Sequence, residues 1–112
     1  MRRLALLAAV LLTLGAADSE LGELAELERA RERRPADPDR RQALGEAYYR
    51  HARQALDARD FETYESYLSK ALDEVVESAR LDPESASPHI FMGIMAAYQG
   101  DIGRTFRSLA NA

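Results

Sequence analysis

The sequence predicts an all-α protein built of antiparallel helical hairpins. Apolar residues recur three or four positions apart in every long segment, which places them on one face of a helix. Alternation with a period of two is confined to short stretches and β-branched residues are sparse, so we expect no strand. Proline, glycine and aspartate separate the periodic segments, at positions where helices commonly end and begin. A chain of 112 residues is long enough for one small domain.

The N-terminal residues have the three parts of a secretory signal peptide. A basic start, an apolar run at 4–14 and small residues at 15–17 precede Asp18, where cleavage is expected. The apolar run is shorter than the ~20 residues that span a bilayer. We therefore divide the chain into a leader at 1–17 and a helical repeat domain at 18–112. The expected location is periplasmic or secreted, and the alternative is a membrane anchor formed by an uncleaved leader.

Composition narrows the chemistry and the partners. The chain has no cysteine, which excludes disulfides and thiolate metal sites. It has 15 basic and 19 acidic residues, and the resulting net charge of −4 disfavours nucleic acid and anionic lipid as the main partners. Lys70 is the one lysine among the basic residues. This preference for arginine, together with abundant alanine, points to a GC-rich bacterial genome.

Three amphipathic helices are expected before the proline at position 83. The first covers 18–34 and ends at the Pro-Ala-Asp-Pro run of 35–38. The second covers 39–59, and a turn at 58–60 leads to a third helix that Asp60 caps and that continues to Leu81. The predicted apolar stripes are Leu21, Leu24, Leu27 and Ala30; Leu44, Ala47, Tyr48, Ala52, Ala55 and Leu56; and Phe61, Tyr64, Leu68, Ala71, Leu72, Val75, Val76 and Ala79.

Charged residues of the first helix are interpreted as a solvated face. Glu28 and Glu32 have the spacing of a carboxylate pair, but contacts with i,i+4 neighbours on a helix surface account for them better than acid–base chemistry. The run from Arg29 to Arg34 is interleaved with acidic residues, and we expect it to be solvated as well.

The segment from 83 to 112 is expected to contain two further helices. Ser87 is suited to cap a helix whose first turn includes Pro88. Gly93 has no side chain, so we expect a neighbouring helix to approach closely there and Gly93→Leu to cost more stability than Gly45→Ala. The Gln-Gly-Asp run at 99–101 predicts a tight turn, with a left-handed glycine that ends one helix and an aspartate that caps the next.

An internal repeat links the two proline boundaries. Ten residues separate Pro35 from Gly45, and ten separate Pro83 from Gly93. On this pattern the chain from about Leu24 onward resembles the tetratricopeptide repeat family, which implies a short solenoid of stacked helical hairpins. The two glycines are 48 residues apart, against 34 for a family repeat, so we expect a lengthened first hairpin. The residues that match the repeat are Pro35, Leu44, Gly45, Pro83, Met92, Gly93, Gly100 and Asp101.

The resemblance implies a groove that binds another protein. In this family, peptides lie in a concave groove lined by the first helix of each repeat. One subtype grips C-terminal carboxylates with Lys and Asn, and it is disfavoured because Gln, Glu and Ile stand at those places. An apolar floor for a helix or an extended segment is expected instead, and burial by a capping element or a second copy is the alternative. The groove positions, carried over by register, are Gln42, Glu46, Tyr49, Ile90, Ile94, Ala97 and Tyr98.

Motifs for catalysis are not found. The sequence has no Walker loop, nucleophile elbow or His-Glu-x-x-His motif. His51 and His89 are on different predicted helices without a recognisable set of partner ligands. Met92 and Met95 are interpreted as core-filling residues. We therefore expect no enzymatic activity, no cofactor and no metal, and we expect an aromatic cluster in the hairpin core from Tyr48, Tyr49, Tyr64 and Tyr67.

The expected function is an exported interaction module or adaptor whose partner is a protein or peptide. The alternative is a structural subunit of a homo-oligomer or envelope complex, assembled through an open C-terminal repeat edge. That alternative rests on a short predicted last helix with apolar residues at Ile102, Phe106 and Leu109, which leaves Ile90 and Ile94 with little cover.

Overall fold

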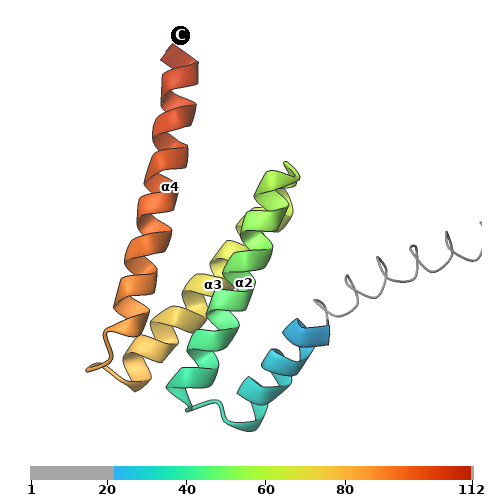
Figure 1. Ribbon diagram of the computed structural model, residues 1–112, viewed down its shortest axis with the longest axis vertical. Coiled ribbons are helices and arrows are strands. Elements are labelled where there is room, and N and C mark those ends of the chain that lie inside the picture. The colour runs from blue at the N-terminus through green and yellow to red at the C-terminus, as the bar shows by residue number, and fades with distance from the viewer. Residues whose placement is uncertain (1–21, 112) are drawn as a thin grey trace, which may run out of the picture.

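The computed structural model describes residues 22–111, and they form an all-helical fold, as predicted. A leading helix at 22–33 is followed by α2 (Pro38–Asp57), α3 (Phe61–Leu81) and α4 (Ser87–Asn111). The hairpin of α2 and α3 lies between the leading helix and α4 (Figure 1). Within the described residues, no helix combines the length and the apolarity needed to cross a membrane. The predicted leader at 1–17 lies outside the described residues.

Local signals set the limits of the central hairpin as predicted. The Asp37 carboxylate accepts hydrogen bonds from the backbone N–H groups of Asp39 and Arg40, and Pro38 occupies the first turn of α2. Arg59 takes a left-handed conformation with φ 60° in the turn, and Asp60 caps α3 by accepting from the N–H of Thr63. The two helices are 20 and 21 residues long and form one long hairpin.

The core of the hairpin is tightest where the start of α2 meets the end of α3. Leu44 and Val75 are completely buried there. A Cβ on Gly45 would lie 2.6 Å from Cγ2 of Val75 and 3.2 Å from the carbonyl oxygen of Ala71, so only glycine allows this approach. The expectation that a neighbouring helix approaches closely at Gly93 is wrong, because a Cβ at that position would meet no atom within 4 Å. Helix contact depends on which neighbour faces the residue, and α4 turns its Gly93 side to solvent.

Helix α4 is a single helix, and this corrects the predicted turn at 99–101. Gly100 and Asp101 are part of the helix, and no glycine in the described residues has the positive φ of a left-handed cap. A glycine inside a helix costs only about 1 kcal/mol relative to alanine, and no proline follows to stop the helix. The predicted trailing hairpin is therefore replaced by one 25-residue helix, which diverges from α2 and α3 toward its C-terminal end (Figure 1).

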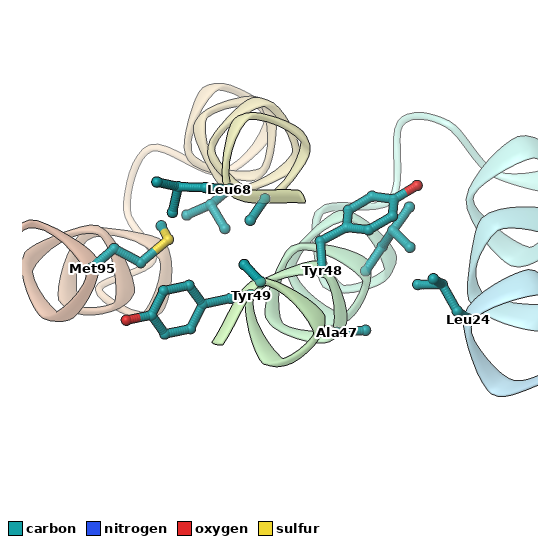
Figure 2. Packing of buried hydrophobic residues seen from close by; sticks show 10 residues of the cluster. Leu24, Ala47, Tyr48, Tyr49, Leu68 and Met95 are labelled. Atoms are coloured by element: carbon teal, nitrogen blue, oxygen red, sulfur yellow. The ribbon is translucent and has the colours of Figure 1, made fainter. Parts of the chain in front are cut away.

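The first half of α4 packs on the hairpin. Met95 and Pro88 are buried, and Phe91, Met92 and Tyr98 pack partly buried against the core. Figure 2 shows Met95 and Tyr49 of α2 pointing toward one another. The packed residues follow one another three or four positions apart, so a single face of α4 makes this contact.

The predicted stripe of α3 is narrower in the structure. Phe61 and Val76 are 50% and 54% exposed, so they do not belong to the core. Glu74 and Ser78 are buried instead. Glu74 and Ser78 each bind a polar partner in α2, and this explains why polar groups occupy the buried face.

Candidate functional site

An open pocket lies between α2 and α4. It has a volume of about 300 Å³ and is lined by Glu46 of α2 and by Ser87, Ile90, Phe91 and Ile94 of α4. Ile90 is 61% exposed and Ile94 54% exposed, which is unusual for large aliphatic side chains that lie side by side. The spacing of the two isoleucines places them one helical turn apart on one face of α4.

The wall contributed by α2 is polar. Gln42 and Glu46 lie one turn apart and are both half-buried. Nε2 of Gln42 donates to Oε1 of Glu46 over 3.4 Å, a long hydrogen bond. Oε1 of Gln42 is buried and has no donor. Glu46 lines the pocket beside the apolar side chains of α4, whereas Gln42, predicted as a groove position, does not line it.

Tyr49 and Tyr98 take a different place from the one the register implied. The Tyr49 ring lies edge-on to Phe91 at 5.4 Å and to Tyr98 at 6.4 Å between centroids, and Tyr49 is buried. These rings join α4 to α2, so they support the groove from inside. The guanidinium of Arg53 lies 5.0 Å from the centre of the Tyr98 ring. Ala97 is exposed and is not part of the pocket lining.

The eight residues that define the predicted repeat serve unequal purposes. Leu44 and Gly45 form the closest part of the core, and Met92 packs partly buried against it. Pro35 and Pro83 lie in the connections that precede α2 and α4, where a helix break was expected. Gly93, Gly100 and Asp101 lie within α4 and break no helix.

One polar cluster was missed from the sequence. The carboxylate of buried Glu74 bridges Arg31 of the leading helix and Arg41 of α2, and the distance to Nη1 of Arg41 is 3.0 Å. Ser78, one turn later, donates its hydroxyl to the carbonyl oxygen of Pro38 over 2.8 Å. The expectation that the 29–34 run is solvated is therefore wrong for Arg31.

A signal for this cluster exists in the sequence. Glu74 and Ser78 share the helix face of Ala71 and Val75, which the apolar stripe identifies as buried. A carboxylate on such a face needs cationic partners, because an unpaired buried charge is costly. The chain supplies many arginines, but local patterning does not say which of them reach Glu74.

The four predicted tyrosines belong to one hydrophobic core, but their rings lie on different sides of α2. Tyr48 and Tyr49 leave α2 in different directions, Tyr48 on the side of the leading helix and Tyr49 toward α4 (Figure 2). Tyr48 packs on Tyr67 with 6.0 Å between ring centroids, and His51 lies 5.4 Å from the same Tyr67 ring. Burial, reinforced by Glu28, raises the pKa of Tyr48 to about 12. Burial also raises the pKa of Tyr49, and the nearby Arg53 opposes that effect.

In the part of the chain that the structure describes, no group of side chains is arranged as a metal site. No three histidine, aspartate or glutamate side chains within residues 22–111 are grouped so that they could hold a metal ion. The His51 ring contacts the Tyr67 ring, and His89 is exposed on another helix.

Comparisons with known proteins do not add a relative. No model of a known protein family matches the chain, and neither a curated protein nor a solved structure matches it.

Proposed function

We propose that this chain is an exported tetratricopeptide-like module that binds another protein through the groove between α2 and α4, without catalytic activity. The observation that carries the proposal is the exposure of Ile90 and Ile94 beside Glu46 in one open pocket. Exposed aliphatic side chains that adjoin one another, with a polar rim, are typical of protein interaction sites. The repeat register of the sequence predicts the same three residues as groove positions.

The helix arrangement is compatible with the repeat proposal. Leading helix, α2, α3 and α4 follow one another with short connections, and α2 and α3 are antiparallel, since Arg41 near the start of α2 meets Glu74 late in α3. In stacked helical repeats, each new helix buries its apolar face on the preceding hairpin. The first half of α4 does this through Phe91 and Met95.

A photo-crosslinking amino acid at position 94 tests the binding site directly. The same label at Val76 is a matched control, because Ile94 and Val76 are both 54% exposed and lie on different helices. In bacterial envelope extract, we expect a discrete adduct with a second protein from position 94 and none from position 76. Equal labelling from both positions, or no adduct from either, would contradict the proposed groove.

A structural subunit that assembles with itself is the competing function. It predicts that the exposed groove residues are covered by a second copy. Light scattering of the purified domain over a wide range of concentrations separates the two functions. A monomer at every concentration supports the interaction module, and a stable oligomer that Ile94→Asp dissociates supports the structural subunit.

Export is a separate part of the proposal and rests on the N-terminal sequence pattern alone. Intact-mass measurement of the protein recovered from the exported fraction tests it. We expect a chain that begins at Asp18, and a membrane-bound form that retains residues 1–17 would contradict it.

A further inference from the structure

Glu46 is the charged residue that lines the groove, and Gln42 is its hydrogen-bond partner on α2. Nε2 of Gln42 faces Oε1 of Glu46, and this fixes the orientation of the amide, because the flipped amide would set its oxygen against a carboxylate oxygen. The atom left without a partner is therefore an acceptor, Oε1 of Gln42. Gln42 does not line the pocket, so Glu46 alone presents its carboxylate to the groove.

The negative charge of Glu46 is not neutralised by the chain. Among the described side chains, Glu46 takes part in no ion pair, whereas the buried Glu74 of α3 pairs with two arginines. The arginines that follow on α2 have other contacts. Arg50 lies 3.5 Å from Glu23 of the leading helix, and Arg53 lies over the Tyr98 ring. The groove therefore has a carboxylate in an apolar setting without a counter-charge.

The apolar wall of the groove limits which side chains of a partner segment can lie next to Glu46. Ile90 and Ile94 are one helical turn apart on α4, and both border the pocket that Glu46 lines. A segment that covers them must present aliphatic side chains. If that segment had no cation, covering the pocket would remove water from Glu46 without compensation, which is costly. An acidic segment would add like-charge repulsion.

We infer that the groove between α2 and α4 takes a partner segment in which an arginine or lysine stands beside aliphatic side chains. This inference rests on the proposed function, because it names the chemistry of the partner at the same groove. The cation pairs with Glu46, and the aliphatic side chains cover Ile90 and Ile94. The net charge of −4 on the chain favours the approach of a basic partner.

The hollows that border the leading helix are less suited to this task. One of about 130 Å³ lies between that helix and α2, and its charged residues Glu23 and Arg50 already pair with one another. Another of about 510 Å³ is lined by residues of the leading helix alone, both acidic and basic. Neither presents a pair of exposed isoleucines.

Three synthetic peptides of equal length and with a fluorescent label test the inference. One contains leucine and arginine, one leucine and glutamate, and one serine and arginine. Anisotropy titrations of the purified domain are expected to show binding of the leucine–arginine peptide and at least tenfold weaker binding of the other two. Glu46→Gln should weaken the leucine–arginine peptide about tenfold, because a charge-assisted contact is lost. Raised salt should reduce the affinity of the wild-type domain more than that of Glu46→Gln.

Matched variants separate the groove from the rest of the surface. Glu62 is an exposed acidic residue at the start of α3 and does not line the groove. Glu62→Gln should therefore leave binding unchanged. Ile94→Ser should weaken binding, whereas Val76→Ser, at a residue of equal exposure, should not. Equal losses from Glu46→Gln and Glu62→Gln would mean that net charge alone attracts the peptide, and this would overturn the inference.

The outcomes distinguish this inference from the proposed function. If the leucine–glutamate peptide binds as well as the leucine–arginine peptide, or if no peptide binds while position 94 still crosslinks to a partner, the partner chemistry is wrong and the groove stands. If position 94 also fails to crosslink, both are wrong. An oligomer that Ile94→Asp dissociates would show that a second copy fills the groove, and this too overturns the inference.

Discussion

The contact between α2 and α3 and the contact of α4 with this hairpin are built differently. On the α2–α3 side, Gly45 lets the helices come so close that an added Cβ would meet Val75 at 2.6 Å. On the α4 side, the register-equivalent Gly93 faces open space, and Ile90 and Ile94 remain exposed beside the contact. One side is a packed and charge-paired core, and the other is a partial contact with a groove along it.

This difference shows that equal sequence register does not give equal packing. Pro35 and Pro83 stand ten residues before Gly45 and Gly93 in the same pattern. The surroundings decide the outcome, because α2 is enclosed by the leading helix, α3 and α4, whereas α4 contacts the hairpin through one face (Figure 1). The tight contact excludes water and the open one leaves Ile90 and Ile94 exposed.

Leu44→Ala should have the largest effect on stability and sharpens the comparison when paired with Met95→Ala. Both side chains are completely buried. We expect Leu44→Ala to lower the free energy of unfolding by about 3–4 kcal/mol, since the enclosing helices cannot close the cavity. Met95→Ala should cost about 2 kcal/mol, since α4 can move toward the hairpin. Urea denaturation measures both, and equal losses would mean that α4 is packed as rigidly as α3.

Glu74→Gln tests the charged part of the tight side. The substitution keeps the shape but leaves Arg31 and Arg41 without their carboxylate. We expect a loss of about 2–3 kcal/mol, below the full cost of a broken buried ion pair because both arginines are partly exposed. Glu77→Gln is the control, since its partner Arg80 is solvent-exposed and such surface pairs contribute about 0–1 kcal/mol. Thermal unfolding that shows no difference between the two variants would contradict the role of Glu74.

Alanine substitutions at the two glycines test the comparison most directly, because their expected effects on stability differ in sign. Gly45→Ala should destabilise the domain by about 1–2 kcal/mol, since overpacking against Val75 and the backbone of Ala71 exceeds the gain in helix propensity. Gly93→Ala should stabilise it by up to about 1 kcal/mol, since the new methyl group meets nothing. Urea midpoints that move in the same direction for both variants would show that the approach of α2 and α3 is looser than described.

Alkaline pH should affect the two tyrosines of α2 unequally. The pKa of Tyr48 is raised from 10.0 to about 12, so the unfolded chain loses this proton first. Stability from Tyr48 is therefore complete below pH 10 and is lost as pH rises toward 12, with a slope below about 1.4 kcal/mol per pH unit. Tyr48→Phe should flatten this decline. Tyr49→Phe should flatten it less, because Arg53 opposes the rise in the pKa of Tyr49. Urea denaturation at a series of pH values measures both slopes, and identical slopes would contradict the difference in environment.

Local sequence determined the helices and the limits of the hairpin. The apolar spacing, the Asp37 and Asp60 caps and the proline boundaries act through contacts within a few residues, so the chain can be read for them without tertiary information. Of the residues predicted from the repeat register, Glu46, Ile90 and Ile94 line the pocket, whereas Gln42, Tyr49, Ala97 and Tyr98 do not. The three lining residues converge because the register of each helix sets the face on which its side chains stand.

Tertiary structure decided which face of each helix packs against which neighbouring helix. Periodicity could not say that Gly45 is pressed against α3 while Gly93 is open, nor that Tyr48 and Tyr49 serve opposite sides of α2. The continuation of α4 through Gly100 follows from a small helix penalty that a local turn motif does not outweigh. The pairing of Glu74 with Arg31 joins residues 43 positions apart. Such contacts arise only when helices pack, because burial makes an unpaired charge costly and therefore selects its partner from distant parts of the chain.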